Sequence, residues 1–222
     1  MFWQRFARIF AWLLLANYIS AFPSSLEYRS DSDDDDEKVV IGYRSCNKIE
    51  AQALQRSVYR DTRFDQPAAR LQLGYGLYTS PSPGEYKADG DWIVVFYMDK
   101  DVFESLPKIW IPATYGGNAI WESEQAVANY IAQHTDVDPE NRGQALRLAP
   151  FSTDKNKLQM LIPTHFANNH GGLITAKAAE KIEDLPERGR VNYDDWDNVK
   201  GDRTDPAAGG GNNGSDSDSD DD

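Results

Sequence analysis

The feature that most constrains this sequence is the gathering of its acidic residues into two flanks with few apolar side chains. Residues 22–37 and 201–222 each carry seven acidic side chains against one arginine, and they account for nearly all of the formal net charge of −13. Segments of this composition do not bury enough apolar surface to offset the entropy lost on ordering. We therefore expect both flanks to be disordered and the fold to be confined to residues 38–200.

Residues 1–21 predict an export signal. Arg5 and Arg8 precede an apolar stretch from Ile9 to Ile19, and Ser20-Ala21 offers small residues for cleavage. This is the layout of a secretory signal peptide, and the stretch is short for a permanent membrane helix. A signal anchor is the alternative. Because no second apolar run of spanning length follows, we expect a secreted, extracellular protein without stable membrane insertion.

The composition also argues against several kinds of site. A single cysteine, Cys46, excludes a disulfide framework or a multi-cysteine metal site, and we expect its thiol to be buried. Only three histidines are present, and His165 and His170 flank Asn168-Asn169, which predicts a turn. We therefore predict no metal site. The acidic balance argues against nucleic-acid binding, which needs a basic face.

The central part of the chain predicts an α+β domain with mostly antiparallel, split sheets and a few helices. Asn47 and Glu50 have the spacing of a helix N-terminal capping box, and Ile49 is expected on the apolar face of that helix. Ser123 is expected to cap a second helix that ends near Gln133. The expected strands are Val39–Tyr43, Trp92–Met98, Lys108–Pro112, Ala145–Leu148 and Leu158–Pro163.

Two segments carry side chains suited to a binding site. Arg44 ends a strand where the chain turns into a helix, a position from which a guanidinium can bind a phosphate or a ribose hydroxyl. Gly74 and Gly76 flank a tyrosine, which leaves room for a flat ligand to approach the backbone. Tyr78 and Tyr86 stand on either side of a Pro-Ser-Pro-Gly loop and are expected to enclose an aromatic ring. An ordinary hairpin with aromatic core residues is the alternative.

Taken in order, Tyr43-Arg44-Ser45 and Gly74-Tyr75-Gly76-Leu77-Tyr78 resemble the ADP-ribosyltransferase superfamily over residues 39–98. The chain is also similar to a group of small secreted fungal proteins in Gly90-Asp91-Trp92 and Leu158–Pro163. The superfamily resemblance implies NAD as substrate and catalytic roles for Arg44 and Tyr78. It implies that four further residues hold the dinucleotide. They are Tyr43, Ser45, Gly76 and Tyr86.

The sequence departs from that superfamily at the acid. The resemblance implies a glutamate on a late strand, where its carboxylate stabilises the positive charge that develops as nicotinamide leaves. Gln159 occupies the matching position here, and an amide supplies no charge. Glu122 and Glu124 are possible substitutes, although Ser123 places them at a helix start.

Three functions follow from these observations. The first is a secreted enzyme that binds NAD and transfers ADP-ribose or hydrolyses the NAD, as an effector, which is a protein exported to act on a host. The second is a catalytically inactive relative that binds a host or partner protein through the same cleft or surface. The third is an unrelated α+β domain whose tyrosines fill the core. An open cleft lined by Arg44, Tyr78 and Tyr86 distinguishes the first two functions from the third. A carboxylate or amide that reaches the same cleft distinguishes the first from the second.

Overall fold

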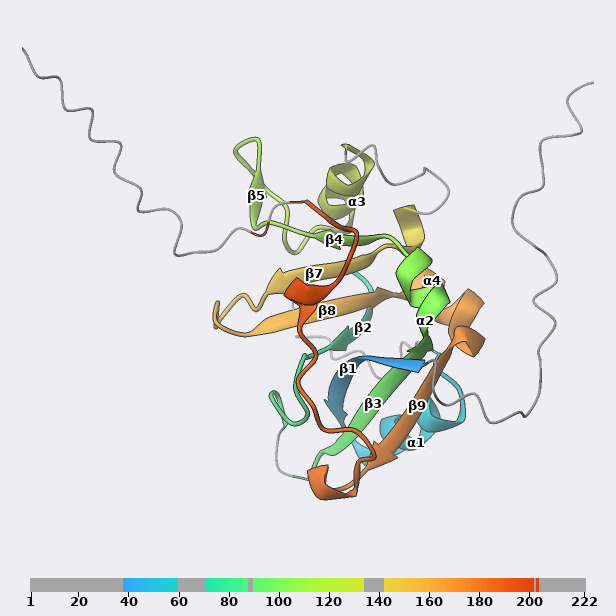
Figure 1. Ribbon diagram of the computed structural model, residues 1–222. Helices are drawn as coiled ribbons and strands as arrows, with labels where there is room; N and C mark the ends of the chain where they lie inside the picture. Colours follow the sequence, from blue (N-terminus) through green and yellow to red (C-terminus); the bar gives the residue numbers. More distant parts are fainter. Residues whose placement is uncertain (1–37, 60–70, 88–89, 134–141, 202, 204–222) are drawn as a thin grey trace, which may run out of the picture. The chain divides into compact units, whose positions relative to one another are not determined.

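The computed structural model describes residues 38–59, 71–87, 90–133, 142–201 and 203 (Figure 1). The predicted signal peptide and the acidic segment 22–37 lie outside the described residues. So does nearly all of the segment 201–222, of which only Gly201 and Arg203 are described. The expectations of export and of disordered flanks therefore stay predictions.

The first sheet has three antiparallel strands in the order β1-β3-β9. They are β1 (Lys38–Cys46), β3 (Trp92–Asp99) and β9 (Ile174–Ala179). The central strand, β3, is buried on both of its faces from Ile93 to Met98. Its unbroken apolar run, which lacks alternation, predicted this double burial.

The second sheet has five strands in the order β10-β4-β7-β8-β2. They are β10 (Val199–Lys200), β4 (Lys108–Trp110), β7 (Leu146–Pro150), β8 (Leu158–Pro163) and β2 (Gly76–Thr79). β4 is parallel to both of its neighbours, whereas β7, β8 and β2 are antiparallel. A separate hairpin joins β5 (Thr114–Tyr115) to β6 (Asn118–Ala119). The prediction of a mainly antiparallel α+β fold is confirmed.

A pair of backbone hydrogen bonds joins the two sheets. The N–H of Tyr43 donates to the carbonyl of Ser80 at 2.9 Å, and the N–H of Ser80 donates to the carbonyl of Tyr43 at 2.7 Å. This bridge sets β1 of the first sheet beside the end of β2, the edge strand of the second (Figure 1). The two segments that the sequence singled out therefore meet where the sheets meet.

Four helices accompany the sheets in the described part of the chain. They are α1 (Lys48–Arg56), α2 (Lys100–Ser105), α3 (Glu124–Gln133) and α4 (Thr164–His170). Their starts follow the predicted capping chemistry: the Asn47 side chain accepts from the N–H of Glu50 at 3.0 Å, and the Ser123 hydroxyl accepts from the N–H of Ala126 at 3.2 Å. Short 3₁₀ turns are η3 (Arg142–Gln144), η4 (Gly171–Leu173), η5 (Ile182–Asp184) and η6 (Tyr193–Asp195).

The second sheet separates two hydrophobic clusters. Leu158, Met160 and Ile162 of β8 belong to the larger cluster, which also contains the first sheet. Leu161 belongs to the smaller cluster, which Tyr78 and α3 complete. Because neighbouring side chains of a strand point to opposite faces, Gln159 shares the face of Leu161. This alternation decides which of the predicted site residues can meet.

Three local expectations were wrong. His165 and His170 lie on the helix α4, not on a turn, and His165 contacts the Asn169 amide one turn later. Ile49 is 72% exposed, and it is Glu50 that is buried in α1, because Glu50 pairs with Arg44. The strand expected to end at Pro112 ends at Trp110. Cys46 is buried, as predicted.

Candidate functional site

Arg44 lies on β1 with its guanidinium already engaged. Its Nε and one terminal nitrogen each lie 2.9 Å from Oε1 of Glu50, and the other terminal nitrogen donates to the carbonyl of Tyr78 at 3.1 Å. The side chains of Arg44 and Glu50 are 17% and 5% exposed. Glu50 reaches Arg44 because the chain turns at Asn47 directly into α1. All three guanidinium nitrogens thus have partners within the protein.

Tyr43 points to the opposite side of β1 and is 1% exposed. Its hydroxyl donates to the carbonyl of Gly189 at 2.8 Å. Burial, with a smaller contribution from Glu187, raises the pKa of the Tyr43 phenol to about 12. Ser45, which pairs with Ile93 of β3, is half-buried, and strand alternation places it on the side of Tyr43 and away from Arg44. Tyr43 therefore anchors a segment of the chain, and its ring is enclosed.

Gly76 and Gly74 have packing roles in this structure. A Cβ at Gly76 would overlap the carbonyl of Ile162 on the neighbouring strand. A Cβ at Gly74, whose φ is +97°, would overlap the carboxylate of Glu124. The space that the two glycines leave open is filled by the protein's own groups.

Tyr78 and Tyr86 have separate partners. The Tyr78 hydroxyl accepts from the N–H of Leu73 and donates to the carbonyl of Gly74, both at 2.9 Å. The Tyr86 hydroxyl donates to the carbonyl of Leu158 at 3.2 Å, and its ring packs against Phe151 with centroids 4.8 Å apart. Burial raises the pKa of Tyr86 well above its usual range. These contacts do not bring the rings of Tyr78 and Tyr86 face to face around a ligand, as the sequence predicted.

Gln159 is 3% exposed and pairs with a second buried amide, Gln72. Its Nε2 donates to Oε1 of Gln72 at 2.7 Å, and Nε2 of Gln72 donates to the carbonyl of Pro150 at 2.8 Å. The two amides join β8 to the chain that leads into β2. Gln159 therefore lies on the face of Tyr78, whereas Tyr43 belongs to the other cluster.

A buried arginine that the sequence analysis missed organises the loop before β2. Arg147 of β7 is 5% exposed, and it donates to the carbonyl of Leu73 at 2.7 Å and to Oε1 of Glu124 at 2.9 Å. Oε2 of Glu124 accepts from the N–H of Tyr75 at 2.9 Å. The side chain of Glu124 is thus committed to this clamp. The sequence pattern predicted a strand around Arg147, but no local pattern indicated that Glu124 would pair with it.

Lys108 is a second buried cation that sequence reasoning missed. It is 1% exposed, and its Nζ donates to the carbonyls of Phe103 and Leu106 at 2.6 and 3.2 Å. Nζ also lies 4.1 Å from the centre of the Phe103 ring. Burial lowers the pKa of this ammonium. Its contacts satisfy carbonyls at the end of α2, which is a structural role.

Residues 186–196, here called the C-terminal strap, cross the junction of the two sheets. In Figure 1 the strap rises from η5, passes in front of both sheets and continues through η6 to β10. Gly189 accepts from Tyr43, and the N–H of Val191 donates to the carbonyl of Pro81 at 2.8 Å. Tyr193 is 1% exposed, in the larger cluster. The strap thus covers the side of the junction to which Tyr43 points.

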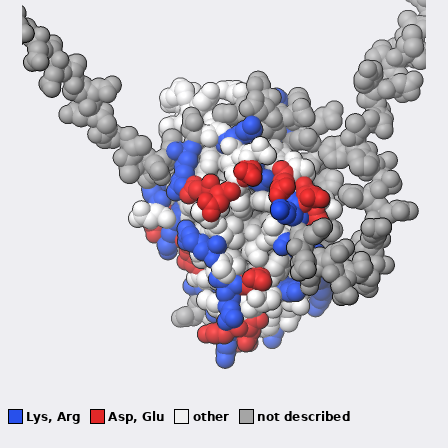
Figure 2. Space-filling model, in the orientation of Figure 1, with Lys and Arg blue, Asp and Glu red and all other residues white. Residues whose placement is uncertain are grey.

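The surface over the strap carries charges of both signs. Figure 2 shows Lys and Arg intermixed with Asp and Glu on this face. The described residues contain no group of three or more side chains placed to bind a metal ion. Within the same residues, no helix has the length and apolar content needed to cross a bilayer.

Residues 71–202 match the model of a family of unknown function (DUF5910), and the chain belongs to that family. The matched range contains Gln72, Glu124, Arg147, Gln159 and the C-terminal strap, whereas Tyr43-Arg44-Ser45 precede it. A comparison with curated proteins gave no match.

Proposed function

We propose that this chain is an exported binding protein with an ADP-ribosyltransferase-like domain and no NAD-cleaving activity of its own. The observation that carries this proposal is the engagement of Arg44. Glu50 neutralises its charge, and the Tyr78 carbonyl uses its remaining nitrogen. A guanidinium that is to hold a phosphate or a ribose would have to give up an ion pair in which the carboxylate is 5% exposed.

The position of Gln159 supports the same proposal. A residue that orients a ribose must reach the ligand, and this amide is buried against Gln72. Replacement of a carboxylate by an amide also removes the charge that would stabilise an oxocarbenium-like transition state. Both the missing charge and the occupied amide argue against NAD cleavage.

Tyr75 favours a binding role. The residue is 58% exposed, and its backbone is held on both sides: its N–H donates to Glu124, and its carbonyl accepts from the N–H of Thr164 at 3.1 Å. An exposed aromatic residue on a fixed backbone loses little entropy on binding, and such residues are frequent energetic centres of protein interfaces. We infer a protein partner that contacts Tyr75.

The enzymatic half of the proposal is tested by measuring nicotinamide release from NAD by the purified chain after residue 21. Arg44→Ala is compared with Arg56→Ala, which removes an exposed arginine at the C-terminal end of α1. We expect all three proteins to match the buffer rate. Release that Arg44→Ala abolishes and Arg56→Ala leaves intact would overturn the proposal in favour of an NAD-consuming enzyme, the second candidate.

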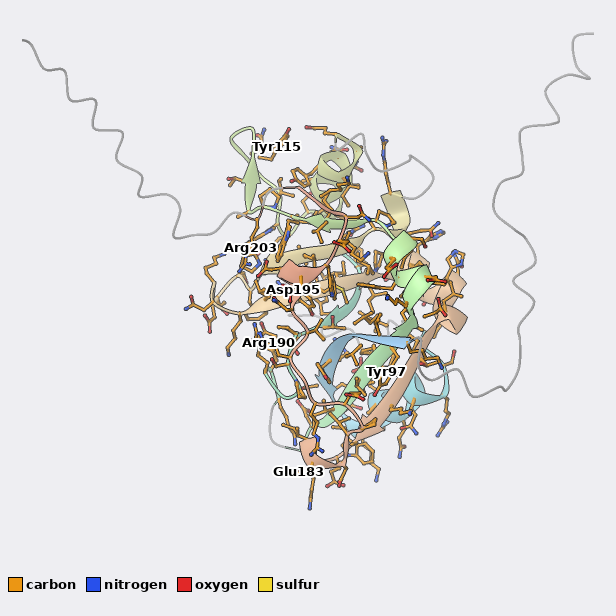
Figure 3. The ribbon with its side chains drawn as sticks, viewed as in Figure 1. Tyr97, Tyr115, Glu183, Arg190, Asp195 and Arg203 are labelled. Atoms are coloured by element: carbon orange, nitrogen blue, oxygen red, sulfur yellow. The ribbon has the colours of Figure 1, made fainter. Side chains whose placement is uncertain are left out.

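The binding half is tested by comparing Tyr75→Ala with Tyr115→Ala in affinity capture at matched protein concentration. Tyr115 is 47% exposed and lies on the separate β5–β6 hairpin (Figure 3). We expect one partner to be recovered with the unaltered chain and with Tyr115→Ala, and to be lost with Tyr75→Ala. Equal recovery with both variants would exclude Tyr75 from the interface.

A further inference from the structure

The C-terminal strap contains an exposed stretch between two buried residues. Every residue from Pro186 to Arg190 is exposed, and the backbone has no turn or bend from Glu187 to Asn192. Leu185 before the stretch and Val191 after it are 3% and 9% exposed, and both belong to the larger cluster. The stretch is therefore an extended loop whose two ends are fixed in the core.

The second half of this loop is bonded to the body of the protein at three successive residues. The bonds run from the Tyr43 hydroxyl to the Gly189 carbonyl at 2.8 Å, from Arg190 to the Ser82 hydroxyl at 3.1 Å, and from the Val191 N–H to the Pro81 carbonyl at 2.8 Å. Figure 3 shows Arg190 on the strap between the labelled Glu183 and Asp195. The chain that follows Arg188 is therefore held in place residue by residue.

The peptide bond between Arg188 and Gly189 is the accessible bond of the loop. The Arg188 side chain is exposed and forms no hydrogen bond or ion pair with any described residue. A Cβ at Gly189 would meet nothing within 4 Å beyond its chain neighbours, so the space beside this bond is open. The next basic residue, Arg190, differs because its guanidinium is bound to Ser82 and Val191 after it is buried.

The chemistry of the loop selects a class of partner. A serine protease with an acidic specificity pocket binds an extended segment of chain and takes a long basic side chain into that pocket. Arg188 offers such a side chain on an exposed, extended backbone. Because the loop is fixed at both ends before binding, it loses less conformational entropy on binding than a free peptide would lose.

We propose that the C-terminal strap is a substrate-like loop through which the chain binds and inhibits a serine protease with an acidic specificity pocket. The Arg188 side chain enters the pocket, and its carbonyl carbon lies at the catalytic serine of the protease. The loop acts independently of NAD, of Arg44 and of the partner inferred for Tyr75. The chain thus has a second interaction surface, with a partner of its own.

The bonds after Arg188 make the chain an inhibitor and not a substrate. The protease serine attacks the Arg188 carbonyl carbon, the bond to the Gly189 nitrogen breaks, and the serine proton passes through the protease histidine to that nitrogen. The products are an ester of Arg188 and a new amine at Gly189. Because Gly189, Arg190 and Val191 stay bonded to the protein, the amine remains beside the ester. It attacks the ester before water does, which re-forms the peptide bond and returns the proton to the serine.

The experiment adds the chain after residue 21 to trypsin, whose specificity pocket is acidic, and to chymotrypsin, whose pocket is apolar. The activity of each protease is followed with a small chromogenic substrate, and electrophoresis of the same samples follows cleavage of the chain. We expect a saturable and lasting loss of trypsin activity and no loss of chymotrypsin activity. Complete cleavage between Arg188 and Gly189 with undiminished trypsin activity would show an ordinary substrate and overturn the proposal, and so would the absence of any inhibition.

Variants assign the inhibition to Arg188. Arg188→Ala should raise the inhibition constant for trypsin at least about tenfold, as expected for the central side chain of an interface. Arg56→Ala, which removes an exposed arginine of α1, should leave the constant unchanged. Arg188→Phe should transfer the inhibition from trypsin to chymotrypsin. Equal inhibition of trypsin by Arg188→Ala and by the unaltered chain would overturn the proposal.

A further pair of variants tests the bonds that hold the loop. Tyr43→Phe removes the donor to the Gly189 carbonyl, and Ser82→Ala removes the acceptor of Arg190. Each should bind trypsin at first and then be cleaved after Arg188 faster than the unaltered chain, with recovery of trypsin activity. If Tyr43→Phe does not fold, Ser82→Ala decides alone. Cleavage of Ser82→Ala at the rate of the unaltered chain would contradict the role given to these bonds.

Discussion

The carboxylate of Glu50 lies 2.9 Å from two nitrogens of Arg44, and this ion pair joins the first turn of α1 to the strand that precedes it. The pair is mostly buried, and it also holds the Tyr78 carbonyl of β2 through the third guanidinium nitrogen. One arginine thus connects a helix and both sheets. Arg44 therefore has a structural role, because all three of its guanidinium nitrogens bind groups of the protein itself.

We predict that Glu50→Ala lowers the free energy of unfolding by about 3 kcal/mol, because it leaves the Arg44 charge mostly buried and unpaired. Arg44→Ala should have a comparable effect. Removal of both residues should cost less than the sum of the two single changes, since the second change removes a group that the first had already left unpaired. Urea denaturation of the four proteins measures the coupling. Strict additivity would show that the pair contributes nothing.

We predict that Gln159→Glu destabilises the protein and gives no NAD turnover. The substitution places a carboxylate where a buried amide donates to Gln72, so the Gln72 oxygen loses its donor. Gln159→Ala should cost about 1–3 kcal/mol, because it leaves the same oxygen without a partner. Urea midpoints and nicotinamide release are measured on both variants. A gain of nicotinamide release in Gln159→Glu would instead support the role that the superfamily resemblance implies.

We predict that the contribution of Cys46 to stability falls at alkaline pH. Burial, with a smaller contribution from Glu50, raises the pKa of the thiol from 9.0 to about 12. The unfolded chain therefore loses this proton first as the pH rises above 9, and the folded state becomes less stable until the pH reaches about 12. The stability difference between the unaltered chain and Cys46→Ala should shrink between pH 8 and pH 11. A difference independent of pH would contradict this.

We predict that a chain of residues 38–203 keeps the thermal midpoint of the protein after residue 21, whereas a chain of residues 38–200 melts about 2–4 °C lower. Arg203 pairs with Asp194 of η6 and lies 5.2 Å from the centre of the Trp110 ring. The ion pair is partly exposed, so its loss costs no more than about 1 kcal/mol. Differential scanning calorimetry compares the two chains. Equal midpoints would place the boundary at Lys200, as the composition alone predicted.

Much of the local structure was predictable because it depends on neighbours in the sequence. The capping of α1 by Asn47 and of α3 by Ser123 needs only side chains three residues away. The double burial of β3 follows from its apolar run.

The partners of the polar side chains were decided by the tertiary structure alone. Gln159 meets Gln72, and Arg147 meets Glu124, across separations in sequence that no local pattern reports. Strand alternation then placed Tyr78 and Tyr43 against different clusters, although both are tyrosines at the same junction. A side chain's type shows what it can bind, but its partner depends on which strands lie side by side, because hydrogen bonds act over about 3 Å.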